Sequence, residues 1–325
     1  MSNIPYLPDW IIAAYIFIIG VCIGSFLNVV ILRSLSNEGF VFSRSKCPYC
    51  SNQLKWYMNI PLFSYIFLKG QCAYCKKKIS LQYPLVELLT GLVFLGTFLF
   101  FGLAYKTLFL CVIFSFFIVL SGTDFKQTVI VDIHSYILYA ICLVYSTLGF
   151  NELGFLQAFL GSIFAFLFFE GICLISRLII KQRMFGFGDS LIALSIGALF
   201  GVKNTIIVIL LSFIIQSLSA IPLLIKKAYL ENKKKLALSY FFVFVSILSL
   251  VFIKKLPSNY YLATVLIMTV FLIYSSKNIL LELNNKKDND NFAIMPFGPA
   301  FLMAAFICVF YLVQIKKFVI EFFIY

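Results

Sequence analysis

Four cysteines form the most regular chemical pattern in this chain of 325 residues. Cys47 and Cys50 make one Cys-x-x-Cys pair, Cys72 and Cys75 make a second, and 21 residues separate the pairs. Two such pairs supply four thiolates for a tetrahedral ion, most simply Zn²⁺. The alternatives are free thiols or redox-active pairs. Because the zinc interpretation uses all four thiols as ligands, it predicts a structural and not a catalytic metal site.

Two aspartates form a second candidate constellation. Asp124 follows the apolar segment 107–123, and Asp189 ends a Gly-Phe-Gly-Asp run that opens another apolar segment. Gly186 and Gly188 of that run let the backbone bend and approach closely. Two carboxylates in contact cannot both ionise, so one holds a proton while the other acts as a base. Such a pair activates a water against a peptide carbonyl; the alternative is two helix-end carboxylates that contact only water.

Other acids are weaker candidates for chemistry. Asp132 opens an apolar segment and is expected to cap it. Glu87 lies just inside a segment, where a cation of the polar loop is its expected partner. Glu170 lies within a segment and is interpreted as a buried, protonated, hydrogen-bonded acid or as a relay. His134 is the single histidine, which excludes a metal site built from several histidines.

The composition decides which elements must position these residues. Hydrophobic residues make up 62% of the chain and charged residues only 12%, against about 25% charged in ordinary globular proteins. The mean hydropathy is +1.01. These values exclude a soluble enzyme, a disordered tail and a coiled coil. They predict an all-α polytopic membrane protein with about eight to ten transmembrane helices.

Apolar runs give the expected positions of those helices. The candidate spans are 10–32, 84–103, 107–123, 133–149, 155–176, 190–201, 204–225, 238–253, 259–275 and 296–314. The segment 190–201 is too short to cross a bilayer core of ~30 Å. It is therefore expected to continue upstream into 183–189 or to lie in a cavity lined by protein.

The distribution of positive charge predicts the orientation in the membrane. The net charge is +13, and twenty of the 26 Lys and Arg residues fall on one side of the expected spans, eight of them in the loop 33–83. Positive residues accumulate in cytoplasmic loops, so this loop is predicted to be cytosolic. The reducing cytoplasm disfavours disulfides in it. Residues 1–9 carry no positive charge, so a cleavable signal peptide is not expected.

Five segments are expected along the chain. The polar loop 33–83 has too little apolar surface to fold unaided, which fits a metal that holds it together. The segments are a first transmembrane helix (1–32), the four-cysteine loop (33–83), a transmembrane core with both aspartates (84–225), an inserted segment with two extra spans (226–292), and a last core helix with a tail (293–325).

In this order, the motifs resemble those of the type IV prepilin leader peptidases, a branch of the GxGD intramembrane aspartyl proteases. The resemblance covers most of the chain. It rests on the two cysteine pairs, on Asp124, and on the motifs at 24–33 (GSFLNVVILR), 56–61 (WYMNIP), 83–90 (YPLVELLT), 186–189 (GFGD) and 296–299 (PFGP).

The resemblance implies an aspartyl endopeptidase with Asp124 and Asp189 as its catalytic residues. It also implies that Asp132, Gly186 and Gly188 shape the active site and that the four cysteines bind zinc. Its substrates would be type IV prepilins and pseudopilins, cleaved after a short basic leader at the cytoplasmic face of a bacterial inner membrane. Many members also N-methylate the new N-terminus with S-adenosylmethionine, and the cytosolic loop is the expected contributor to this activity. No glycine-rich loop marks a site for the cofactor, so its binding residues are unknown. The partners are the substrates and membrane lipid, not nucleic acid.

Departures from the family pattern leave alternatives open. Val131 stands where a proline usually precedes the second acid, and Leu191 replaces a common lysine after the Gly-Phe-Gly-Asp run. Residues 226–284 are interpreted as an insertion. Rival interpretations are another GxGD protease of the preflagellin type, a proton-coupled transporter that uses the membrane acids, and an inactive scaffold with a zinc loop.

Overall fold

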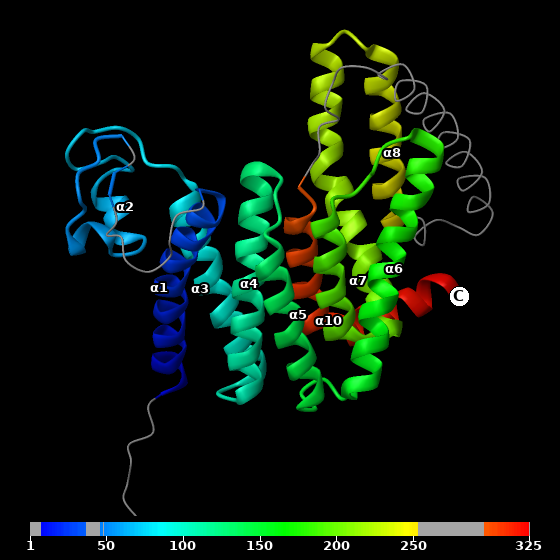
Figure 1. Cartoon of the computed structure of the whole chain (residues 1–325), viewed down its shortest axis with the longest axis horizontal. Helices are drawn as coiled ribbons and strands as arrows, with labels where there is room; N and C mark the ends of the chain where they lie inside the picture. Colours follow the sequence, from blue (N-terminus) through cyan, green and yellow to red (C-terminus); the bar gives the residue numbers. More distant parts are fainter. Residues whose placement is uncertain (1–7, 37–45, 48, 253–295, 325) are drawn as a thin grey trace, which may run out of the picture.

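The protein is a bundle of roughly antiparallel helices with a small loop unit attached at one edge (Figure 1). A computed structural model describes residues 8–36, 46–47, 49–252 and 296–324. The helices of this part are α1 (Asp9–Ser36), the 3-10 helix η1 (Trp56–Asn59), α2 (Phe63–Phe67), α3 (Gln82–Phe101), α4 (Tyr105–Gln127), α5 (Asp132–Thr147), α6 (Gly154–Ile180), α7 (Phe187–Leu230), α8 (Lys234–Phe252) and α10 (Gly298–Ile324).

Six helices of the described part are long and apolar enough to cross a membrane: α1, α3, α4, α6, α7 and α10. Apolar segments become helices in a bilayer because each backbone N–H and C=O must be satisfied within its own segment. Described residues outside the helices form only isolated bridges and no extended strand. The predicted class, an all-α polytopic membrane protein, is therefore confirmed.

Helix α7 consists of two helical segments that meet at Gly201. This residue has a non-helical backbone, with φ +69° and ψ 169°, and it separates the expected spans 190–201 and 204–225. Residues 191–200 are almost entirely buried, so this short apolar run lies in a protein-lined environment. The expected span 259–275 lies outside the described residues, and so does most of the expected inserted segment.

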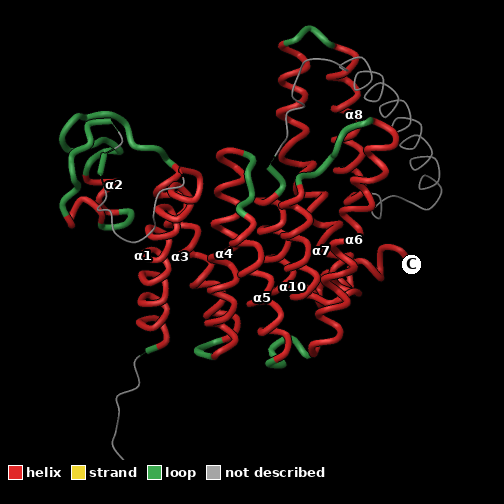
Figure 2. Tube along the Cα trace, viewed as in Figure 1, coloured by secondary structure: helices red, strands yellow, loops and turns green. Residues whose placement is uncertain are grey.

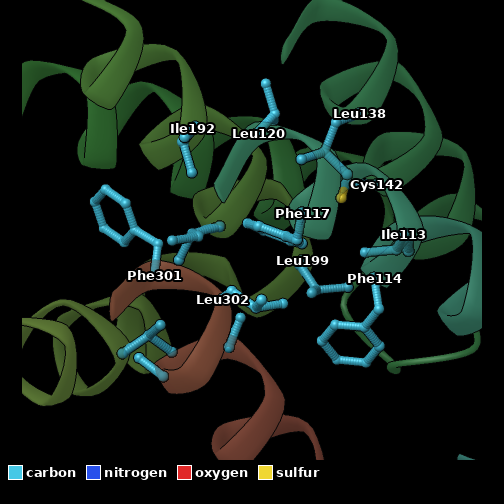
Figure 3. Close-up of a cluster of buried hydrophobic side chains, with 14 of the residues drawn as sticks. Ile113, Phe114, Phe117, Leu120, Leu138, Cys142, Ile192, Leu199, Phe301 and Leu302 are labelled. Atoms are coloured by element: carbon cyan, nitrogen blue, oxygen red, sulfur yellow. The ribbon is translucent and has the colours of Figure 1, made fainter. Parts of the chain in front are cut away.

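Helix α4 lies at the centre of the bundle, in contact with α1, α3, α5 and α10. Its inner face carries fully buried Phe117 and Leu120. Figure 3 shows these side chains in one interior with Ile192 of α7 and Phe301 of α10. This core fixes the last turn of α4 and the first turns of α7 and α10 next to one another.

The loop unit formed by residues 46–81 lies beside the upper ends of α1 and α3 (Figure 2). One buried acid ties it to the bundle, because Oε2 of Glu87 in α3 accepts the N–H of Leu62 at 2.8 Å. Leu62 has a φ of +61°, which is rare for a residue with a branched side chain. The expected cation partner of Glu87 is thus wrong, since a backbone N–H takes that place.

Candidate active site and metal centre

The two cysteine pairs form two turns of matching geometry. The N–H of Ser51 donates to the carbonyl of Cys47 at 2.9 Å, and the N–H of Lys76 donates to that of Cys72 at 3.0 Å. Both Ser51 and Lys76 have a positive φ, +56° and +58°. Isolated bridges close each turn, Lys46 with Gln53 and Gln71 with Lys78. Each turn directs the thiols of its pair toward those of the other.

All four Sγ atoms lie within 4.8 Å of one another. The Sγ atoms of Cys47 and Cys75 are 3.9 Å apart. A tetrahedral ion with metal–sulfur bonds of ~2.3 Å needs sulfur atoms ~3.8 Å apart, so this donor set fits a metal of the zinc type. The cluster can hold a metal, as the sequence predicts.

Backbone donors prepare one of these thiols for a metal. The N–H groups of Cys75 and Tyr74 lower the pKa of the Cys72 thiol to about 6. At neutral pH this group is mainly thiolate, and the thiolate is the form that binds metal ions. The backbone conformation of the second turn therefore stabilises the metal-binding thiolate of Cys72 even without a bound ion.

Asp124 lies in the last turn of α4 and is only 4% exposed. Its Oδ2 accepts the N–H of Gly298, the first residue of α10, at 2.7 Å. The N–H of Phe297 also interacts with this carboxylate. A helix N-terminus presents free N–H groups and a positive dipole end, which stabilise an anion. The Pro-Phe-Gly-Pro motif thus supplies the main donors to Asp124.

Asp189 lies in the first turn of α7 and is 8% exposed. Its Oδ2 accepts the N–H of Gly186 at 3.0 Å, and its own N–H donates to the carbonyl of Gly186 at 3.2 Å. Its other oxygen, Oδ1, is buried and has no hydrogen-bond partner among the described residues. A buried oxygen without a protein donor is available to a water or to substrate.

The structure brings the two aspartates together, although 65 positions separate them. Their carboxyl groups are close enough to interact electrostatically. The loop after α4 meets the first turn of α7 at Gly188, where a Cβ atom would lie 2.4 Å from Cβ of Ile130. Only glycine permits this approach. Gly186 is different, since its Cβ would make an ordinary contact of 3.4 Å with Asp189 Oδ2.

A cluster of phenylalanines packs where the elements that carry the aspartates meet. Phe297, which precedes Gly298, lies 5.4 Å from Phe185, which precedes Gly186, between ring centroids. Phe169 of α6 packs on Phe185 at 5.3 Å. Edge-to-face contacts of this kind stabilise aromatic packing. The backbone donors of both aspartates are therefore anchored in one apolar cluster.

An ion pair next to Asp189 was not foreseen from the sequence. Glu170 of α6 accepts hydrogen bonds from Arg183 and, at 2.6 Å, from Ser190 Oγ. Nε of Arg183 also donates to the carbonyl of Phe185 at 2.7 Å. Arg183 in turn interacts electrostatically with Asp189. Glu170 is therefore an ion-paired, partly exposed residue that supports the Gly-Phe-Gly-Asp segment. The interpretation as a buried, protonated acid is wrong, because Arg183 pairs with the carboxylate. The sequence signal for this residue was its position within a span.

Asp132 has a less central position. It is the first residue of α5, its side chain is exposed, and Val131 occupies the N-cap position without a side-chain hydrogen bond. The expectation that Asp132 caps this helix is therefore wrong, because the residue lies one position inside it. An acid in a first turn still interacts favourably with the helix dipole.

The fold and these sites define a polytopic helical membrane protein with two buried, adjacent aspartates and a four-cysteine unit. Two family models match it: the bacterial peptidase A24 N-terminal domain over residues 18–101 and the type IV leader peptidase family over residues 111–221. The first range contains the cysteines and the second contains both aspartates.

Proteins named prepilin leader peptidase/N-methyltransferase are similar in sequence. The one from Myxococcus xanthus is 34% identical over 61% of this chain and 58% of its own length. Those from Vibrio cholerae and Neisseria gonorrhoeae are 31% and 29% identical, over 61% and 65% of this chain and 81% and 82% of their own lengths. No solved structure matches the chain. The chain belongs to the type IV leader peptidase family.

Proposed function

We propose that this protein is an aspartyl endopeptidase that removes the basic leader of type IV prepilins and pseudopilins. The observation that carries the proposal is the meeting of Asp124 and Asp189, both buried and each held by a backbone N–H. The names of its relatives support the same reaction and substrate class.

The geometry supports hydrolysis by a shared proton. One carboxyl group is ionised and takes a proton from water as the water oxygen bonds to the scissile carbonyl carbon. The other carboxyl group is protonated and donates a hydrogen bond to the carbonyl oxygen. The first group then returns its proton to the leaving nitrogen as the C–N bond breaks. Oδ1 of Asp189, which lacks a partner among the described residues, offers a site for that water or carbonyl.

Removal of either carboxylate tests the proposal. We expect Asp124→Asn and Asp189→Asn each to lower cleavage of a co-expressed prepilin by about 10²–10⁴-fold, the usual contribution of an acid or base. The mobility shift of the pilin on a gel measures this. Glu152→Gln, which changes an exposed acid between α5 and α6, is the matched control. Full cleavage by either Asn variant in membranes that contain the protein would refute the dyad.

The transporter interpretation predicts a different outcome. Both aspartates lie near helix ends on one side of the bundle, in the last turn of α4 and the first turn of α7, and not at mid-span. Ion-dependent flux in proteoliposomes, lost in the Asn variants without any change in cleavage, would favour transport over proteolysis.

We propose Zn²⁺ as the metal of the four-cysteine cluster. The ion would hold the two turns together and supply no step of the reaction. Metal analysis of the purified protein is expected to find about one zinc per chain. Cys47→Ser with Cys72→Ser should abolish it, whereas Cys142→Ser, at a buried thiol of α5, should not.

N-methylation of the cleaved N-terminus is a second candidate activity. The observation that favours it is the N-methyltransferase in the printed names of the relatives. S-adenosylmethionine would supply the methyl group. Labelled S-adenosylmethionine should transfer label to cleaved pilin in the presence of the protein, and Asp189→Asn given pre-cleaved pilin separates this activity from cleavage. Absence of label on pre-cleaved pilin would refute the proposed methyl transfer.

We propose a bacterial inner membrane as the location, with the four-cysteine unit on the cytoplasmic side. The excess of Lys and Arg in its loop supports this orientation. Reporter fusions placed after residue 80 and after residue 104 are expected to report opposite sides of the membrane, because α3 separates the two positions.

A further inference from the structure

The four-cysteine unit leaves large apolar side chains in solvent on its two short helices. Trp56 of η1 is 79% exposed, and Phe63, Ile66 and Phe67 of α2 are 62%, 71% and 81% exposed. We call these four residues the η1–α2 face. Soluble domains seldom leave such a patch uncovered, and one of this kind marks a protein or membrane contact.

The members of this face lie on two neighbouring short helices. Phe63, Ile66 and Phe67 are spaced i, i+3 and i+4, which places them on one side of α2. Helix η1, which carries Trp56, contacts α2 directly. The face therefore combines one side of α2 with an exposed tryptophan on the adjacent helix.

The unit lies beside the ends of two membrane-spanning helices. In Figure 1, α2 lies at the height of the upper end of α1, outside the bundle and not beyond its end. Spans α1 and α3 reach Leu35 and Gln82 at this end. In the first turn of α3, Leu85 is 61% exposed. The unit is therefore at the height where these spans would meet the lipid headgroups.

The charge of the unit identifies the chemistry of its partner. Residues 46–81 contain six lysines and no Asp or Glu. Lys55 and Lys69 directly flank η1 and α2, and both are exposed. Aromatic side chains with flanking lysines are typical of the membrane interface, where rings lie at headgroup depth and ammonium groups contact anionic phosphates. A basic peptide would be repelled by the same lysines.

The link to α3 keeps the face at a fixed height. Glu87 holds the N–H of Leu62, the residue that precedes α2. Glu87 itself lies in the second turn of span α3. The start of α2 is therefore tied to a residue whose depth in the membrane is set by its span.

We infer that the η1–α2 face docks on the anionic lipid surface beside α1, with its aromatic rings among the headgroups. The four-cysteine unit then rests on the membrane at a second point besides its connections to α1 and α3. This inference does not depend on the proposed peptidase activity.

The two tryptophans of the chain allow a direct test. Trp10→Phe leaves Trp56 as the single tryptophan. The full-length variant is placed in nanodiscs at one copy per disc, with anionic lipid and with bromine at different acyl-chain depths. We expect blue-shifted Trp56 emission, strongest quenching by the shallowest bromine, and protection from iodide in water. Water-like emission, full quenching by iodide and no effect of bromine would overturn the inference.

Variants and lipid composition separate lipid from other occupants. Lys55→Gln with Lys69→Gln, and zwitterionic lipid with the unchanged lysines, should each reduce the bromine quenching of Trp56. Phe63→Ser with Phe67→Ser should reduce it further, whereas Tyr49→Ser, at an exposed aromatic outside the face, should leave it unchanged. Protection that appears only with two copies per disc, or only with added prepilin, would assign the face to those partners and refute lipid docking.

Discussion

Asp124 and Asp189 are both buried acids near helix ends, but different parts of the chain hold them. The donor to Asp189 is the N–H of Gly186, three positions earlier in the loop that leads into α7. The donor to Asp124 is the N–H of Gly298, 174 positions later and on another helix. One aspartate is positioned by its own loop, and the other is positioned by the docking of α10.

The two aspartates of one site therefore differ in what positions them: short-range hydrogen bonds position Asp189, and packing between distant helices positions Asp124. The loop that precedes α7 folds Asp189 into place with short-range hydrogen bonds, so changes in distant helices should leave that arrangement intact. Asp124 keeps its donor only while α10 stays packed against α4, which it contacts through the core. Substitutions at the glycines around each aspartate can test the comparison.

The largest effect is expected at Gly188, where the loop after α4 meets the first turn of α7. Gly188→Ala puts a Cβ atom 2.4 Å from Cβ of Ile130, so this loop and α7 must separate. A displacement of about 1 Å in a catalytic group costs about 10²-fold in rate. Prepilin cleavage in membranes with matched protein levels measures the loss.

A compensating substitution makes this prediction specific. Ile130→Ala shortens the side chain that Gly188→Ala meets, so the double variant is expected to recover part of the activity. Equal inactivity of the single and double variants, both present in the membrane, would contradict a contact that holds the aspartates together.

A smaller loss is expected at Gly298. The Cβ of Gly298→Ala would lie 3.0 Å from Asp124 Oδ2 and 3.3 Å from Cα of Ser121, so α10 must shift and the N–H bond to Asp124 lengthens. Loss of one such bond to a charged group corresponds to about tenfold in rate. Steady-state cleavage should show a fall in kcat with little change in KM, and an unchanged rate would show that Asp124 does not depend on α10.

Glu170→Gln should have a moderate effect, because Glu170 acts through Arg183 and not on substrate. Glu170 and Arg183 are 29% and 25% exposed, and partly exposed ion pairs contribute at most about 1 kcal/mol, or about fivefold in rate. Arg183→Gln should cost at least as much, because it also removes the hydrogen bond to the carbonyl of Phe185, and the double variant should cost no more than Arg183→Gln alone. Additive losses would show that the two residues act separately.

The smallest effect is expected at Gly186, despite its place in the same motif as Gly188. The Cβ of Gly186→Ala would make an ordinary 3.4 Å contact with Asp189 Oδ2, and its N–H would still donate. We expect less than about a threefold loss of cleavage, since the substitution removes no contact. A loss as large as that of Gly188→Ala would show that both glycines are needed for backbone conformation.

Much of the fold follows from local sequence. Apolar runs predict α1, α3, α4, α5 and α6 within a few residues because a bilayer permits only segments that satisfy their own backbone. The break in α7 also agrees with the two expected spans 190–201 and 204–225, since Gly201 between them has a non-helical backbone. Helix α1 also continues to Ser36, beyond the expected end of its span at residue 32.

The sequence by itself determined the class of the protein, the paired cysteine turns and the two aspartates as candidates. Each of these follows from the hydropathy of a segment or from a spacing of a few residues. Local backbone geometry is sufficient to turn such a pattern into structure. The tertiary structure alone decided that α10 supplies the donor to Asp124, that Glu170 pairs with Arg183, and that Glu87 holds Leu62. These partners come from different elements, so they depend on how side chains pack between helices, and no local pattern encodes that packing.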